Sequence, residues 1–189
     1  MHFKIAHSAE GKKVMVTEVI VKRAVDGDDE AFKILYEDLY KDMYRIAYYK
    51  LQNKEDAEDV VSEAVFDMYK GISKLKELAA YRAWAMKILS VKCSVKLKEY
   101  CQNKSEDIEE LDISSDYDVE RDSVLRADII HALDILSDEE KTIVLCSAVA
   151  GMSSEEISEV TNLKSGTIRS KLSRALEKLR NCKCFKYSY

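Results

Sequence analysis

The chain of 189 residues contains no proline and only 5 glycines, and this scarcity limits the folds open to it more than any other feature. Glycine and proline make the tight turns of β-hairpins and β-sandwiches, and proline also breaks helix interiors. A chain with almost none of either favours helices throughout. At this length we expect one or two small helical domains, each able to bury a core.

Composition excludes several classes of protein. Hydrophobic residues make up 47% of the chain, too many for a wholly disordered protein. No apolar run approaches the ~18 residues of a membrane-spanning helix, so we expect no membrane insertion. The N-terminus lacks the apolar core and cleavage site of a signal peptide, which indicates a cytoplasmic protein. The formal net charge of −5 argues at first against nucleic-acid binding.

The cysteines and histidines do not form a recognisable site. The 5 cysteines include no CxxC pair and have no matching set of histidines, so we expect free thiols, no metal and no cofactor. The 3 histidines lie far apart, and no glycine-rich phosphate loop or nucleophile motif occurs. The sequence therefore indicates a protein that is not an enzyme.

Residues 15–100 have the hydrophobic spacing of a helical bundle and follow a tail over residues 1–14. The expected helices run from Thr17 to about Val25, from after Gly27 to Asn53, from Asp56 to near Gly71, and from about Leu78 to Tyr100. Asp28 or Asp29 can cap the second helix. The apolar positions expected on the fourth are Trp84, Ile88, Val91, Val95 and Leu97.

An acidic stretch over residues 101–122 follows the bundle. It holds nine acids and two bases, an excess of 9 − 2 = 7 negative charges. Such a segment cannot bury enough apolar surface to fold alone, so it predicts a flexible linker.

Residues 123–182 make a second helical block, which a tail over residues 183–189 follows. Two capping boxes, at residues 137–140 and 153–156, predict two helix starts. Gly151 can end the first helix, Asn162 can form a left-handed turn, and Ser165 can cap a last helix. A short helix, a turn and a longer basic helix together indicate a helix-turn-helix.

The last helix predicts DNA binding. Its expected buried face carries Ile168, Leu172, Ala175, Leu176 and Leu179, and the opposite face carries polar and basic residues. From residue 164 to 189 there are eight bases and one acid, an excess of 8 − 1 = 7 positive charges, so the acidic average conceals a basic end. In a helix-turn-helix such a face enters the major groove. A solvated basic face at a helix C-terminus is the plainer alternative.

Three segments in this order resemble bacterial RNA polymerase sigma factors of the sigma-70 family, in particular the extracytoplasmic-function (ECF) type. They are GDDEAFKILYEDLY at residues 27–40, DAEDVVSEAVF at 56–66, and the stretch from Leu136 to Arg180. The resemblance implies an all-α fold of two small helical domains: a region 2 bundle over 15–100 and a region 4 helix-turn-helix over 123–182, joined by the acidic flexible linker. It also implies core RNA polymerase and promoter DNA as partners.

The resemblance assigns a polymerase-binding surface. The acidic face of the helix that starts near Asp56 would dock on the β′ clamp, while the β flap is a further contact of such factors. The matching positions are Asp56, Glu58, Asp59, Ser62 and Glu63, with Ser62 where a glutamine is usual. Charge complementarity would orient this docking. A solvated acidic face that the helix dipole stabilises is the alternative.

The resemblance also assigns two promoter-reading helices. The helix near residues 78–100 would recognise and open the −10 element, with candidates Tyr81, Arg82, Trp84, Lys87, Lys92, Lys96 and Lys98. This helix departs from the family, because Val91, Val95 and Lys98 replace an asparagine, an aspartate and an arginine. We interpret Trp84 as a core anchor rather than a stacking platform. The −35 candidates are Ser165, Thr167, Arg169, Ser170, Lys171 and Arg174, with Arg169 nearer bases and Arg174 nearer phosphate.

Our main hypothesis is therefore an ECF-type sigma factor that directs promoter-specific initiation. A sigma-derived regulator that binds DNA or polymerase without opening promoters stays open as an alternative. A stand-alone helix-turn-helix activator with a dimerising or sensing N-terminal bundle is another. Such factors are commonly held by an anti-sigma protein, but no residue of this sequence identifies one.

Overall fold

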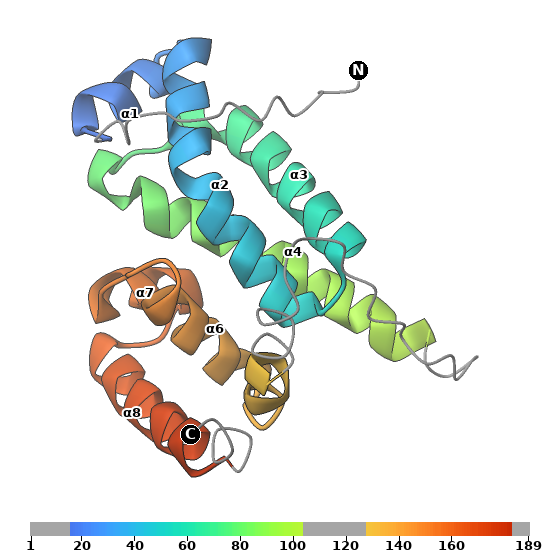
Figure 1. Ribbon diagram of the computed structural model, residues 1–189. Coiled ribbons are helices and arrows are strands. Elements are labelled where there is room, and N and C mark those ends of the chain that lie inside the picture. Colours follow the sequence, from blue (N-terminus) through green and yellow to red (C-terminus); the bar gives the residue numbers. More distant parts are fainter. Residues whose placement is uncertain (1–15, 104–127, 183–189) are drawn as a thin grey trace.

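The computed structural model describes residues 16–103 and 128–182 (Figure 1). Both expected tails, and most of the expected linker, lie outside the described residues. The elements are α1 (Glu18–Val25), α2 (Asp29–Leu51), α3 (Lys54–Gly71), α4 (Tyr81–Asn103), α6 (Asp138–Ala148), α7 (Ser154–Thr161) and α8 (Ser165–Asn181), with short 3-10 turns at Ile72–Lys74 and Leu78–Ala80. Residues 128–133 are helical as well, and no strand occurs in the described ranges. The all-α fold is confirmed.

Side-chain caps fix where the N-terminal helices begin. The Asp28 carboxylate accepts a hydrogen bond from the Ala31 N–H at 3.1 Å and starts α2, as predicted. The expected start of α3 at Asp56 is wrong, because Asn53 caps the helix. Its side-chain carbonyl accepts from the Asp56 N–H at 2.9 Å, and α3 begins at Lys54. Asparagine is among the best N-cap residues, so the residue that breaks one helix also starts the next.

Both predicted capping boxes are present. The Ser137 hydroxyl accepts from the Glu140 N–H at 3.2 Å, and the Glu140 carboxylate accepts from the Ser137 N–H at 3.0 Å. Ser153 and Glu156 make the same pair of bonds at 3.2 and 2.8 Å. These reciprocal bonds begin α6 and α7 where the sequence places them.

The turn before α8 is confirmed in part. Asn162 adopts the expected left-handed conformation, with φ at 58°. The expected cap by Ser165 is wrong, because Ser165 is already helical and Lys164 holds the N-cap position without a side-chain cap bond. The Ser158 hydroxyl instead donates to the Leu163 carbonyl and ties α7 to the turn.

The N-terminal bundle (residues 16–103) packs α2, α3 and α4 against one another, with α1 against one end of α2 (Figure 1). Its buried residues include Leu35, Leu39, Met43, Val61, Ala64, Met86, Leu89 and Cys93. The predicted apolar face of α4 is wrong at two positions: Val91 is 57% exposed and Val95 is 50% exposed. Met86, Leu89 and Cys93 on another side of the helix are buried instead. Apolar residues lie on several sides of α4, so their spacing alone does not identify the inner side.

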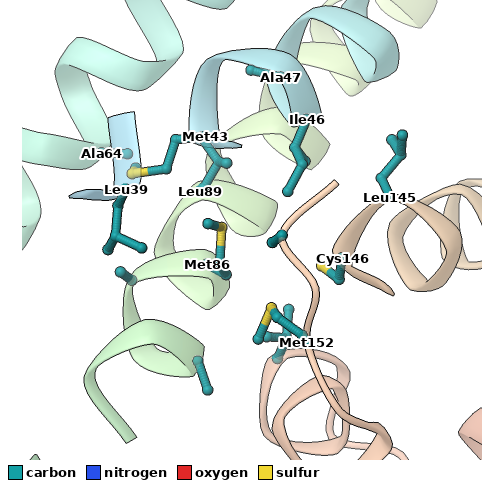
Figure 2. Close-up of a cluster of buried hydrophobic side chains, with 14 of the residues drawn as sticks. Leu39, Met43, Ile46, Ala47, Ala64, Met86, Leu89, Leu145, Cys146 and Met152 are labelled. Atoms are coloured by element: carbon teal, nitrogen blue, oxygen red, sulfur yellow. The ribbon is translucent and has the colours of Figure 1, made fainter. Parts of the chain in front are cut away.

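The C-terminal domain (residues 128–182) packs directly on the N-terminal bundle. Figure 2 shows Ile46 and Ala47 of α2 and Met86 and Leu89 of α4 in one cluster with Leu145, Cys146 and Met152 of the C-terminal domain. The buried hydrophobic residues therefore form one continuous core across both domains. Nothing in the hydrophobic spacing predicted this contact, because spacing reports one helix at a time.

Two cysteines belong to this shared core. Cys93 is fully buried and Cys146 is nearly so, and both are free thiols. Burial raises the pKa of Cys93 to about 11 and that of Cys146 to about 12. Both side chains therefore behave as small apolar residues rather than as reactive thiolates. Within the described residues, none of the helices has the length and apolar character to cross a membrane.

Candidate nucleic-acid and protein interfaces

The outer side of α3 carries a row of acidic residues. Glu58, Asp59 and Glu63 are exposed along it, and the Ser62 hydroxyl beside them donates to the Glu58 carbonyl at 2.8 Å. The helix begins at Lys54, so Glu58 and Asp59 lie in its second turn and Glu63 lies near its middle. The row forms a continuous negative surface suited to a basic partner.

Asp56 is arranged differently from the other four α3 candidates. Its carboxylate is 2.7 Å from the Lys96 ammonium of α4 and accepts a hydrogen bond from the Tyr100 hydroxyl. Partial burial raises the pKa of Asp56, but the bonds from Lys96 and Tyr100 outweigh this effect, so the pKa lies below its ordinary value. Asp56 therefore holds α3 against α4.

Exposed aromatic residues continue the acidic row, and sequence reasoning missed them. Phe66 is 56% exposed, with the Lys70 ammonium 3.8 Å from its ring centroid, and Tyr69 is 52% exposed. Their spacing of four and seven residues from Ser62 was the available signal, because it places them on the same helix side. Large exposed aromatic residues are frequent energetic centres of protein interfaces. The α3 face therefore suits a protein partner.

Two of the seven α4 candidates are anchored in the N-terminal bundle. Tyr81 is buried, and its hydroxyl donates to the Asp38 carboxylate at 3.0 Å. Burial, followed by the nearby Asp38 charge, raises the pKa of Tyr81 above its ordinary value. Trp84 is half-buried against the core, and a Cβ added at Gly71 would lie 3.2 Å from its ring. This packing is that of a core anchor, and Gly71 makes room for it.

The lysines in the second half of α4 form ion pairs with α3. Lys92 lies 3.0 Å from Asp67 and 3.2 Å from Glu63, and the hydrogen bond to Asp67 raises its pKa above the ordinary value. Lys96 is held by Asp56, whereas Lys98 is exposed. The acidic side of α3 and the basic side of α4 therefore meet along one seam of ion pairs. Glu63 is part of this seam and also of the exposed acidic row on α3.

Arg82 and Lys87 contact the C-terminal domain. The Arg82 guanidinium donates to the Ala150 carbonyl at 2.9 Å and lies 3.8 Å from the Asp42 carboxylate. The Lys87 ammonium donates to the side-chain carbonyl of Asn162, the left-handed turn residue, at 2.7 Å. These two cations thus meet the two segments that flank α7.

The helix-turn-helix that the sequence predicts is formed by α7 and α8. Ile168 is fully buried between the helices, and Ala175, about two turns further along α8, is buried on the same side. The expected burial of Leu176 is wrong, since 42% of it is exposed. The inner side of α8 meets α6 and α7 through Ile168 and Ala175, and Leu176 lies at the edge of that contact.

The outer side of α8 presents the predicted polar residues together. Thr167, Arg169, Ser170 and Arg174 are exposed, while Ser165 and Lys171 are partly buried. Arg169 pairs with Glu155 at 3.2 Å, and Lys171 pairs with Glu139 at 2.5 Å. Exposed ion pairs of this kind contribute only ~0–1 kcal/mol, so these cations can exchange a carboxylate for a phosphate. The surface has the charge and shape of a major-groove reading helix.

Comparisons with known families match both domains. The family described as Sigma-70 region 2 matches residues 35–98, and the family described as Sigma-70, region 4 matches residues 126–179. The RNA polymerase sigma factor SigV of Bacillus subtilis is 27% identical over 140 residues, which cover 74% of this chain and 83% of SigV. The ECF RNA polymerase sigma factor SigW of the same bacterium is 25% identical over 182 residues, covering 88% of this chain and 96% of SigW.

Solved structures share the fold. CnrH, in complex with the cytosolic domain of CnrY, gives a TM-score of 0.69 at 18% identity over 86% of this chain and 94% of CnrH. The sigma factor RpoE of Bartonella quintana, in complex with the anti-sigma factor NepR, gives a TM-score of 0.63 at 19% identity. That match covers 83% of this chain and 99% of the solved one.

Proposed function

This chain belongs to the sigma-70 family of RNA polymerase sigma factors, in its extracytoplasmic-function group. From that membership we propose which of its surfaces binds polymerase and which bind the two promoter elements. The chain binds core RNA polymerase and directs promoter-specific initiation. Its family is one of non-catalytic initiation factors, so we assign it no active site. We place it in the cytoplasm, where polymerase and promoter DNA are found.

The α3 face is our assigned surface for the polymerase β′ clamp. Glu58, Asp59, Ser62 and Glu63 supply its negative charge and hydrogen-bonding groups, and Phe66 adds exposed apolar area beside them. We keep Asp56 in this set, with the further role of fixing α3 against α4 through Lys96 and Tyr100. Opposite charges on the clamp would speed encounter and orient the complex.

The outer side of α8 is our assigned reader of the −35 element. We assign Arg169, near the start of the helix, to base edges, and Arg174, about one and a half turns further along, to phosphate. Thr167, Ser170 and Lys171 complete the contact, and Ser165 lies at the end of α8 that enters the groove first. The exposed polar face on a well-formed helix-turn-helix is the observation that carries this assignment.

Our assigned −10 reader is α4. Lys98 is available to solvent, Lys92 and Lys96 lie at the seam with α3, and Arg82 and Lys87 lie where the C-terminal domain packs. Tyr81 and Trp84 would support this helix from within rather than stack on bases. A strand held by such a basic track would be recognised mainly through its backbone.

Run-off transcription tests the function directly. Core polymerase alone, core with this protein, and core with Arg169→Ala would be compared on a pool of genomic promoter fragments from the source bacterium. We expect discrete transcripts only when the wild-type protein is added, and at least ~5-fold fewer with the variant. Promoter-dependent transcripts that are equally abundant without the protein would contradict the assignment.

A sigma-derived regulator that does not open promoters is the second candidate, and one observation favours it. Val91 and Val95 occupy exposed α4 positions at which the family usually has polar residues. Stable promoter binding by polymerase with this protein, without any strand opening, would support this second function and reject the first.

A further inference from the structure

Two exposed valines form a small apolar patch in the middle of α4. Val91 is 57% exposed and Val95 is 50% exposed. The two are four residues apart, so they are neighbours on one side of the helix, and we call them the valine pair. Ile88, one turn before Val91, is partly buried and packs against the core. The valine pair is therefore the solvent-facing end of an apolar strip that is otherwise held in the protein.

Positive charge surrounds the valine pair. Residues 78–98 hold five bases and no acid. Lys98 is exposed one turn after Val95, and Lys87 lies one turn before Val91 with its ammonium 2.7 Å from the Asn162 side chain. The next acid along the helix is Glu99, whose carboxylate lies 3.8 Å from the Lys96 ammonium. The side of α4 that carries the valine pair is thus apolar in its centre and basic at both ends.

This combination suits a nucleic-acid strand better than a second copy of the chain. Two copies that met through the valine pair would bring their lysines together, and like charges at an interface are unfavourable. Two valines also fall far short of the ~800 Å² per partner that a stable protein interface buries. A single strand offers phosphates to the lysines and bases to the apolar centre.

The chemistry of valine selects among the bases. Its side chain neither donates nor accepts hydrogen bonds, so it cannot pair with the polar edges of adenine, guanine or cytosine. Thymine carries an apolar group on its edge, the C5-methyl, which apolar side chains contact. Val91 and Val95 are separated by ~6 Å along the helix axis. Stacked bases are only ~3.4 Å apart, so each valine can meet a different base.

We propose that Val91 and Val95 read thymine methyl groups in the −10 strand, so that the preferred −10 element carries thymines at two nearby positions. The inference rests on the proposed function, because it requires α4 to be the −10 reader. Lys98 then holds the backbone without regard to sequence, and the valine pair adds the base preference that a basic track alone lacks.

Two single strands that differ only in methyl groups test this reading. Strands of ~12 thymidines and of ~12 deoxyuridines would be titrated by fluorescence anisotropy with core polymerase plus the full-length protein, and with core alone. Burial of one methyl group corresponds to about a 3-fold change in affinity. We expect the thymidine strand to bind ~10-fold more tightly than the deoxyuridine strand, since two valines each bury one methyl group.

Three controls make the result specific to the valine pair. The double variant Val91→Asn/Val95→Asn should reduce the preference for thymidine to that of core alone. Val19→Asn, which changes a valine that is 68% exposed on α1, should keep the full preference. A strand of ~12 deoxyadenosines should bind the wild type and the double variant about equally, which shows that backbone contacts and folding are intact.

Each contrary outcome has a distinct meaning. Equal binding of the thymidine and deoxyuridine strands despite a gain over core alone, or a preference that survives in the double variant, would overturn this inference and leave the proposed function standing. No gain over core alone with any strand would reject α4 as the −10 reader and the inference with it. A wild-type dimer that the double variant converts to a monomer in sedimentation would show that a second copy covers the valine pair, which also overturns the inference.

Discussion

Arg169 and Arg174 are both exposed on α8 but should contribute to DNA binding in different ways. We expect Arg169→Ala to weaken binding to the cognate −35 sequence by ~1–3 kcal/mol and to relax the base preference there. We expect Arg174→Ala to weaken all sequences about equally and to reduce the salt dependence by about one phosphate contact. Holoenzyme affinities for cognate and scrambled −35 DNA, measured over a salt series, separate these effects.

Arg23→Ala is the matched control, because Arg23 is an exposed arginine on α1 that pairs with Asp28 within its own domain. It should change neither affinity nor base preference. Equal losses of specificity from Arg169→Ala and Arg174→Ala would contradict the separate roles.

Asp56 should make stability depend on pH in the acid range. Its pKa is lowered in the folded protein by the bonds from Lys96 and Tyr100, against the opposing effect of burial. Its contribution is therefore present at neutral pH, above the ordinary aspartate pKa of about 3.9, and is lost as the pH falls through the lowered value. We expect Asp56→Asn to be less stable than the wild type at pH 7 and to lose less on acidification.

Urea unfolding at pH 7 and in acid measures this difference. Asp59→Asn, an exposed aspartate on the same helix, serves as the control and should follow the wild type. A wild-type and an Asp56→Asn protein that lose stability in parallel below about pH 4 would contradict the role of Asp56.

Single residues show how far local sequence specifies local structure. The capping boxes at Ser137 and Ser153 were predictable, because each cap and its partner lie three residues apart. Ser165 was misassigned because a serine can occupy either the cap or the first helical turn, and the turn at Asn162 decides which. The ion pair of Asp56 with Lys96 was not predictable, since the two residues are distant in sequence.

At the scale of elements, the acidic face of α3 should decide affinity for core polymerase. We expect the double variant Glu58→Lys/Asp59→Lys to bind core at least ~10-fold more weakly, and the wild type to lose affinity as salt rises. Glu77→Lys, an exposed charge reversal outside α3, is the control. Unchanged affinity of the double variant in a polymerase binding titration would reject the α3 face as the docking surface.

The helix α4 shows why periodicity failed for one element and worked for others. On α2 and α3 the aliphatic residues and methionines gather on one side, and that side is buried as the pattern predicts, whereas Phe66 and Tyr69 lie on the exposed side of α3. The helix α4 packs against α2, α3 and also α7 of the C-terminal domain, so apolar residues lie on several of its sides. Val91 and Val95 of this helix are exposed to solvent, and only the tertiary arrangement distinguishes them from the buried residues.

At the scale of the whole molecule, the two domains form one hydrophobic core that no local sequence pattern predicts. A predicted linker between two helical blocks favours independent domains, yet Lys50 and Met86 of the first block are buried against the second. No local pattern marks a buried lysine as a partner for Asp138, because the two lie far apart along the chain. The domain architecture was predictable, and the packing of one domain on the other was not.

The packing of the two domains should protect Cys146 from chemical labelling. Its side chain is 2% exposed in the shared core, whereas Cys101 at the end of α4 is exposed. We expect maleimide to label Cys101 quickly and Cys146 slowly in the wild type. Asp138→Lys, which sets a second positive charge against Lys50, should speed the Cys146 reaction by at least ~10-fold. Mass spectrometry of timed samples gives both rates, and equal Cys146 rates in both proteins would contradict the protection of Cys146 by the domain contact.

Permanganate footprinting most directly tests the claim that this chain is a sigma factor that opens promoters. Core polymerase and the full-length protein would be assembled on a promoter located by mapping polymerase across the genome after overexpression. We expect unpaired, reactive thymines around the −10 element only when core, protein and promoter are all present. A stable complex of all three in which no thymine becomes reactive would contradict promoter opening by this protein.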